Sequence, residues 1–130
     1  MKYLLDVNAL LARAHVAHAA YRATSDWMTA LPAGAEVCTC SIVEIGFLRV
    51  AVQARLQPDI ATARRALADL KVSAHLILLS DDIGAAALPA YVTRPAEITD
   101  GHLLALARRH GAKLATLDTG IPGALLITAS

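Results

Sequence analysis

Short apolar runs alternate with segments of helical periodicity along the chain, and this alternation restricts the fold more than any other feature of the sequence. The five strand-like runs cover residues 2–6, 36–40, 75–80, 113–117 and 125–128. Between them, apolar residues recur at helical spacing, chiefly over residues 8–31, 41–55, 58–72 and 99–110. Strands that alternate with helices form parallel sheets, because each helix returns the chain to the start of the next strand. The pattern therefore predicts an α/β sandwich around a mostly parallel sheet.

Local signals refine this map. Ser41 and Glu44 have the S-x-x-E spacing of a capping box at the start of a helix. The run 75–80 is apolar enough for a buried strand, and residues 81–89 are expected to form a short alanine-rich helix that Pro89 closes.

Composition limits the class of protein. The 130 residues suffice for one core, so we expect a single domain over 1–130, and with only 4% aromatic residues that core must be built mainly from 28 alanines and 20 leucines. The longest uncharged stretch, 119–130, is shorter than the roughly 20 residues of a membrane helix. Asp6 interrupts the apolar run that a secretory signal would need. We therefore expect a cytoplasmic protein with no membrane segment.

Four carboxylates stand at positions that suggest chemistry. Asp6 and Asp118 each follow an apolar strand, whereas Glu44 and Asp100 fall in the first turns of predicted helices. In a parallel sheet these helix starts lie on the same side as the carboxyl ends of the strands. Carboxylates about 5 Å apart repel by roughly 3 kcal/mol at an effective dielectric of 20, so a convergent group calls for protonation or a divalent cation such as Mg²⁺.

Each acid also has a purely structural interpretation. Glu44 could serve the capping box, Asp100 could interact with the helix dipole, and Asp118 before Thr119-Gly120 could belong to a turn. Asp6 is harder to explain without a function, because it lies between an apolar strand and an apolar helix start. The residues alone leave both interpretations open.

Four segments together resemble the motifs of PIN domains: Leu4-Leu5-Asp6-Val7-Asn8, Ser41-Ile42-Val43-Glu44, Thr99-Asp100-Gly101-His102 with the leucine-rich helix after it, and Leu114-Ala115-Thr116-Leu117-Asp118. Chain length and the stretch 43–50 are most similar to VapC toxins of bacterial toxin-antitoxin pairs. The resemblance covers essentially the whole chain. It implies a PIN-like three-layer sandwich and a Mg²⁺- or Mn²⁺-dependent ribonuclease, commonly a homodimer that a small antitoxin protein holds inactive.

Carried over residue by residue, the resemblance makes Asp6, Asp100 and Asp118 metal-binding aspartates and adds Glu44 as a further catalytic or metal-binding acid. It makes Asn8 and Thr116 polar supports of these acids. We expect Asp6 and Asp100 to bind the metal directly, Asp118 directly or through water, and Glu44 to hold a second metal or act as base. For RNA contact, Arg13, Arg49 and Arg94 are the candidates nearest the acids in sequence.

Two other functions are compatible with the residues. Asp6 could be the nucleophile of a phosphatase, although the second aspartate usual two positions later is Asn8 here. The acids could also merely cap helices in a regulatory binding module. The net charge of +1 does not exclude an RNA partner, because setting the four acids aside leaves 12 basic residues against seven acidic ones.

Overall fold

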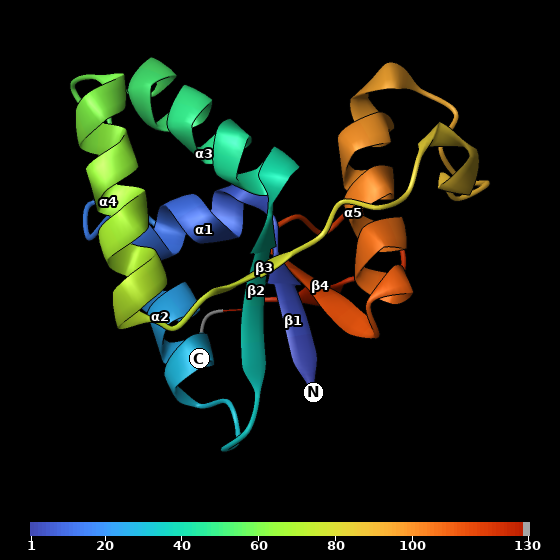
Figure 1. Cartoon of the computed structure of the whole chain (residues 1–130), viewed down its shortest axis with the longest axis horizontal. Coiled ribbons are helices and arrows are strands. Elements are labelled where there is room, and N and C mark those ends of the chain that lie inside the picture. Colours follow the sequence, from blue (N-terminus) through green and yellow to red (C-terminus); the bar gives the residue numbers. More distant parts are fainter. Residues whose placement is uncertain (129–130) are drawn as a thin grey trace.

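Five parallel strands form the central sheet in the computed structural model, which describes residues 1–128 (Figure 1). In spatial order they are β3 (Ile77–Leu79), β2 (Glu36–Cys40), β1 (Lys2–Leu5), β4 (Ala112–Thr116) and β5 (Leu125–Leu126). All four neighbouring pairs are parallel. The predicted α/β class and parallel sheet are confirmed. Residues 129 and 130 of the expected domain lie outside the described range.

Helices cover both faces of this sheet and make it the middle of three layers. Figure 1 shows α1–α4 on one side and α5 on the other. Their bounds are α1 (Val7–Ala14), α2 (Tyr21–Thr29), α3 (Ser41–Gln53), α4 (Ile60–Ser73) and α5 (Ile98–Arg109), with two short 3₁₀ turns, η1 (Ala85–Ala87) and η2 (Pro95–Glu97), before α5. None of the helices within residues 1–128 has the length and apolarity to cross a membrane.

The strand order places a topological switch between β1 and β4. The chain builds outward from β1 through β2 to β3, then crosses back to add β4 on the other side of β1. Because parallel crossovers are right-handed, reversing the direction of building moves the connecting helix to the opposite face, which is why α5 lies opposite α1–α4. Ligands of open α/β sheets bind outside the carboxyl ends of the strands at such a switch.

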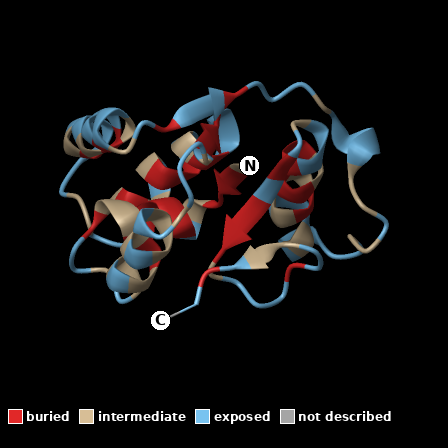
Figure 2. Cartoon of the chain, turned by 90° about the horizontal axis from the view of Figure 1, so that it is seen from below, coloured by how far each residue is buried: buried red, intermediate tan, exposed pale blue. Residues whose placement is uncertain are grey.

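The core is aliphatic and lies on both faces of the inner strands, as the buried residues in Figure 2 show. Phe47 of α3 is fully buried and stacks with the ring of His15, and Trp27 contacts Tyr3 edge to face at a centroid distance of 5.3 Å. Leucines and alanines supply most of the remaining volume, as the composition predicts.

The helix expected over 8–31 is two helices, because the chain breaks at His15. The His15 backbone is extended, with φ −128° and ψ 110°, and its side chain is buried. Nδ1 lies 2.8 Å from the carbonyl oxygen of Leu11, and Nε2 lies 2.9 Å from Nε2 of Gln57. Apolar periodicity does not reveal this break, because a histidine that binds two partners tolerates burial as well as an apolar residue does.

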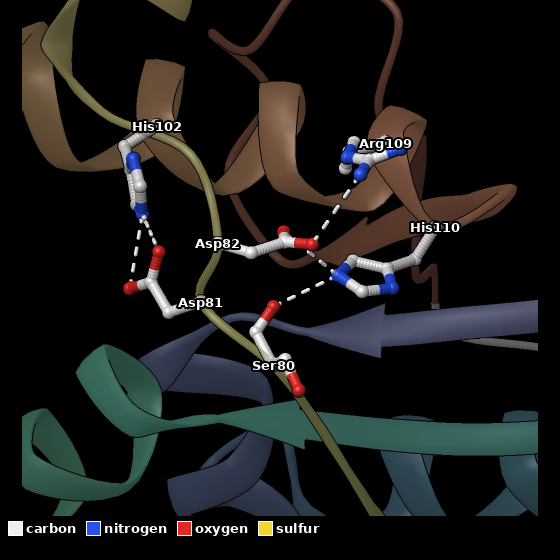
Figure 3. A network of polar contacts seen from close by, with 6 residues as sticks. All are labelled: Ser80, Asp81, Asp82, His102, Arg109 and His110. Atoms are coloured by element: carbon white, nitrogen blue, oxygen red, sulfur yellow. Dashed lines mark hydrogen bonds and ion pairs between the residues drawn. The ribbon is translucent and has the colours of Figure 1, made fainter.

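The segment between β3 and α5 differs from both expectations for it. β3 is an edge strand whose Ile77 and Leu78 are exposed rather than buried, and the short helix expected over 81–89 is reduced to the three residues of η1. Side chains of α5 and of its C-cap residue, His110, hold the start of this segment instead (Figure 3). His102 Nε2 lies 3.0 Å from Asp81, and His110 Nε2 lies 2.8 Å from the carbonyl oxygen of Ser80.

Candidate active site

Asp6 lies at the switch between β1 and β4, directly after β1 and before α1. Its carboxylate is buried, with only 5% of the residue exposed. Oδ1 accepts a hydrogen bond of 2.8 Å from the backbone N–H of Ala9, so Asp6 is the N-cap of α1. The register pairs Leu5 with Ala115 and thereby sets Asp6 beside Thr116.

Thr116 connects two of the predicted acids. Its hydroxyl donates to Oδ2 of Asp6 and accepts a hydrogen bond of 2.9 Å from the backbone N–H of Asp118. Asp118 Oδ1 in turn accepts from the N–H of Gly120 at 2.8 Å, so the turn geometry expected for Asp118 is present. One buried hydroxyl thus fixes the Asp6 carboxylate relative to the start of the 118–120 turn.

Asp100, in the first turn of α5, brings a third carboxylate to the same place. Burial raises the pKa of the Asp6 carboxyl; repulsion from Asp100 and Asp118 adds to this, while hydrogen bonds from Thr116 and Ala9 oppose it. The pKa of Asp100 is raised by burial and by the charge of Asp118. The three aspartates are therefore close enough to repel one another, and the ionised forms of Asp6 and Asp100 are disfavoured.

Asp100 and Asp118 line a pocket of about 250 Å³ together with Tyr91 and Arg94. Arg94 is largely exposed and pairs with Glu97, the Nε to Oε1 distance being 3.5 Å. The Tyr91 hydroxyl is buried and has no hydrogen-bond partner among residues 1–128. Burial raises the pKa of this phenol, and the charges of Asp100 and Glu97 raise it further. Glu97 lines the same pocket, which thus combines three carboxylates with one guanidinium.

Glu44 has a different environment from the three aspartates. Thr39 donates its hydroxyl hydrogen to Oε2, and Nζ of Lys71 lies 3.0 Å from each of the two carboxylate oxygens. The capping box predicted from Ser41 and Glu44 is wrong: the N-cap of α3 is Cys40, and no side chain caps this helix. Glu44 lines a separate groove of about 460 Å³ between α3 and α4.

The remaining predicted residues are dispersed. Asn8 is exposed in α1, and no side-chain hydrogen bond joins it to the acids in the described part of the chain. Arg13 lies in the last turn of α1, at the end away from Asp6, and Arg49 is exposed on α3. Of the three arginines predicted to contact RNA, only Arg94 lines the pocket that holds Asp100 and Asp118.

Sequence reasoning overlooked two residues near the acids, Lys71 and Tyr91. Lys71 falls in the last turn of a helix, where a basic residue has an ordinary electrostatic explanation. Tyr91 stands in a segment without periodicity, where nothing in the pattern indicates which way a side chain points. Both are recognised only from contacts between segments distant in the sequence.

The donor chemistry of the three aspartates fits a hard divalent cation. All their donors are carboxylate oxygens, which Mg²⁺ prefers, and a cation would relieve the repulsion that helps to raise the pKa values of Asp6 and Asp100. No group of three or more histidine, cysteine, aspartate or glutamate side chains within residues 1–128 is by itself arranged to hold a metal ion. Mg²⁺ is usually bound by one or two carboxylates and takes its remaining ligands from water. The three aspartates suit this kind of site, in which the protein supplies only part of the coordination.

Comparison with known proteins identifies the family. A family model of the PIN domain matches residues 3–123, so the chain belongs to the PIN-domain proteins. Ribonuclease VapC38 of Mycobacterium tuberculosis is 39% identical over 123 residues, which cover 91% of this chain and 86% of that protein. Ribonuclease VapC39 of the same organism is 32% identical over 130 residues, covering 93% and 91%. Within the PIN-domain proteins, the chain is a member of the VapC family.

Solved structures show the same fold at low sequence identity. VapBC2 from Rickettsia felis, crystallised with a DNA fragment from its promoter, has a TM-score of 0.68 at 15% identity, with 97% of each chain covered. VapC20 of Mycobacterium tuberculosis, a toxin that cleaves the sarcin-ricin loop, has a TM-score of 0.62 at 14% identity, with 92% of each chain covered. These likenesses confirm the PIN-like three-layer arrangement.

Proposed function

We propose that this protein is a divalent-metal-dependent endoribonuclease toxin whose active site is formed by Asp6, Asp100 and Asp118. The observation that carries the proposal is the meeting of three mutually repelling carboxylates at the switch between β1 and β4. The VapC relatives are ribonucleases by name, which supports hydrolysis of RNA phosphodiester bonds as the reaction.

Asp6 and Asp100 would hold Mg²⁺ or Mn²⁺, with Asp118 binding directly or through water. When bound, such an ion lowers the pKa of a coordinated water and stabilises charge on the scissile phosphate. Thr116 orients Asp6 and the backbone of Asp118, and a fixed carboxylate loses little entropy on binding. Arg94, on the rim of the same pocket, would hold an RNA phosphate.

Asp100 is also suited to receive a proton. It is partly exposed and lines the pocket, so solvent has access to its carboxylate. In this proposal Asp100 accepts a hydrogen bond from water beside the phosphodiester bond to be cut. The more deeply buried Asp6 stays hydrogen-bonded to Ala9 and Thr116.

The test uses purified chain free of any antitoxin and a single-stranded or loop-containing RNA. Cleavage should require Mg²⁺ or Mn²⁺ and should fall by at least about 100-fold in Asp100→Asn, because electrostatic groups of this kind commonly contribute that much. Asp69→Asn, which neutralises an exposed aspartate on α4, is the matched control and should cleave normally. Full activity of Asp100→Asn, or cleavage unaffected by EDTA, would refute the assignment.

A cognate antitoxin and a second copy of the chain are the proposed protein partners, and the cytoplasm is the proposed location. Structures of the same fold support the antitoxin, since one is VapBC2 of Rickettsia felis and another is a toxin-antitoxin complex from Klebsiella pneumoniae. Expression of the chain alone should arrest bacterial growth, and expression with its antitoxin should restore it. Light scattering of the purified chain should give twice the monomer mass, because we propose a homodimer.

The two alternative functions receive less support. A phosphatase with Asp6 as nucleophile would need a second acid near Asn8, and Asn8 is exposed without a bond to the site. A regulatory binding module would explain capping by Asp6, but it does not explain why Asp100 and Asp118 meet Asp6 at the same place. Membership of the VapC family favours the nuclease over both.

A further inference from the structure

The hydroxyl of Tyr91 is a buried donor beside the proposed active site that no group of the protein uses. It has no hydrogen-bond partner among residues 1–128, although the ring packs against the core. Buried hydroxyls are almost always paired, because an unpaired one is costly. Thr24 and Ser25 share this property, but they belong to α2, on the other face of the sheet. Tyr91 therefore offers its hydroxyl to a partner that the chain itself does not supply.

The segment around Tyr91 is held against the start of α5, next to Asp100. A Cβ added at Gly101 would lie 2.4 Å from Cγ2 of Val92 and 3.5 Å from Cδ of Pro89, so the chain on both sides of Tyr91 touches this helix. Burial raises the pKa of the phenol, and the negative charge of Asp100 raises it further. The phenol thus keeps its proton at neutral pH and acts as a hydrogen-bond donor.

The pocket that Tyr91 lines is otherwise rich in acceptors, the carboxylates of Glu97, Asp100 and Asp118. Oε1 of Glu97 accepts a hydrogen bond of 3.0 Å from the backbone N–H of Arg94, whereas Oε2 accepts none in the described part of the chain. A group that fits here must accept from a phenol and donate to a carboxylate. A hydroxyl does both, whereas a phosphate oxygen only accepts and is repelled by the three acids.

We propose that Tyr91 is a specificity-determining residue that recognises the 2′-hydroxyl of an RNA ribose in this pocket. The inference rests on the proposed function, because it places the sugar beside the bond to be cut. The 2′-hydroxyl accepts from Tyr91 and donates to Oε2 of Glu97, the carboxylate not assigned to the metal. The pocket of about 250 Å³ suits one sugar, since pockets that enclose whole small molecules measure roughly 300–1,000 Å³. DNA lacks this hydroxyl, so the contact distinguishes RNA from DNA.

The ribose reaches the hydroxyl by displacing part of the pocket wall, because the hydroxyl is covered in the free chain. Arg94 and Ala96 form one side of this wall. Residues 93–96 are all exposed, and the Arg94 side chain is 75% exposed. Segments with few buried contacts open at little cost, so a small shift of this side of the pocket is accessible.

The experiment measures single-turnover cleavage by the full chain with Mn²⁺. The substrates are one RNA strand and a set of strands of the same sequence, each with a single 2′-deoxynucleotide at one position next to the cut. At one of these positions the wild type should cleave about tenfold more slowly than it cleaves RNA, the upper end of what a neutral hydrogen bond contributes. Tyr91→Phe should cleave RNA about tenfold more slowly than the wild type, but should cleave that substituted strand at the wild-type rate.

Tyr21→Phe is the matched control, because it removes a tyrosine hydroxyl from α2, on the face of the sheet opposite α5. It should leave every rate unchanged. Tyr91→Phe should also resist urea at least as well as the wild type, since the hydroxyl that it loses has no partner in the described chain. A Tyr91→Phe protein that is less stable, or equally slow on every strand, would overturn the inference, because the hydroxyl would then support the fold or Asp100.

The wild-type chain provides a test that does not depend on the folding of any variant. Equal cleavage of RNA and of every substituted strand refutes recognition of the 2′-hydroxyl and leaves the nuclease assignment intact. Complete resistance of one substituted strand would show that the 2′-hydroxyl itself attacks the phosphate, and would refute the recognition role as well. If the wild type cleaves none of the strands, the proposed function fails and this inference fails with it.

Discussion

The hydroxyl of Thr116 should contribute more to stability than any other threonine hydroxyl of the core. Thr116 is 1% exposed, and its hydroxyl both donates to Asp6 and accepts from the N–H of Asp118. Thr116→Val keeps the shape of the side chain but leaves both partners without this bond. A hydrogen bond to a charged group is worth about 1.5–3 kcal/mol and a neutral one about 0.5–1.5 kcal/mol, so we expect a loss of roughly 2–4.5 kcal/mol.

Thr24 offers the same substitution with the opposite expectation. It is fully buried in α2, and its hydroxyl has no hydrogen-bond partner in the described part of the chain. Thr24→Val removes a polar group that is desolvated without compensation, so stability should stay level or rise by about 1 kcal/mol. Both variants exchange one hydroxyl for one methyl group, and differences in volume and helix propensity are therefore small.

Urea unfolding of the metal-free protein measures both effects directly. The loss in Thr116→Val should shrink as pH falls, because the bond from Thr116 favours the charged form of Asp6 and this carboxyl is protonated in acid. In thermal scans, each 1 kcal/mol corresponds to roughly 2–6 °C for a chain of this size. Equal losses in the two valine variants, or a larger loss at Thr24, would refute the reasoning.

Three further predictions concern the site and the segment before α5. Burial and the charge of Asp118 raise the pKa of Asp100, so the wild-type protein loses stability as pH rises through that pKa. Metal-free Asp100→Asn should therefore be more stable than the wild type at pH 7, and the difference should vanish below about pH 4. Urea unfolding at several pH values measures this difference. Gly101→Ala should cost about 1–3 kcal/mol in urea unfolding, since its Cβ would lie 2.4 Å from Val92 Cγ2, and a stability gain would show that this segment yields freely. Asp82→Asn removes the carboxylate that lies 3.3 Å from Nε2 of His110. Overall stability should change by less than about 1 kcal/mol, while amide hydrogen exchange of residues 80–84 should become faster. Unchanged exchange would contradict the view that His110 holds this segment through Asp82.

The sequence predicts the sheet and the identity of the acids because both depend on local patterns. β1, β2 and β4 are short apolar runs between helical segments, and Asp6 and Asp118 follow strands that pair with the expected neighbours. Asp59 likewise acts as N-cap of α4, accepting a hydrogen bond of 2.7 Å from Thr62, where Pro58-Asp59 marks a helix start. Each of these features is determined within a few residues.

The rest depends on contacts that no local pattern records. Ser41 and Glu44 satisfy the spacing of a capping box, yet Glu44 bonds to Thr39 and to Lys71, 27 residues away. His15 ends α1 through contacts that include Gln57, 42 residues away. The separate placement of Glu44 from the aspartates follows from such distant partners, and only the folded chain reveals it.

The order in which the strands are made has a consequence for when the enzyme becomes active. Asp6 directly follows β1, whereas Thr116, its hydrogen-bond donor, is synthesised 110 residues later and Asp118 later still. Contacts between such distant segments form late in folding, because the entropy of closing a long loop must be overcome first. A nascent or truncated chain that lacks β4 thus carries Asp6 without its partners. Nuclease activity should arise only after β4 and Asp118 have left the ribosome.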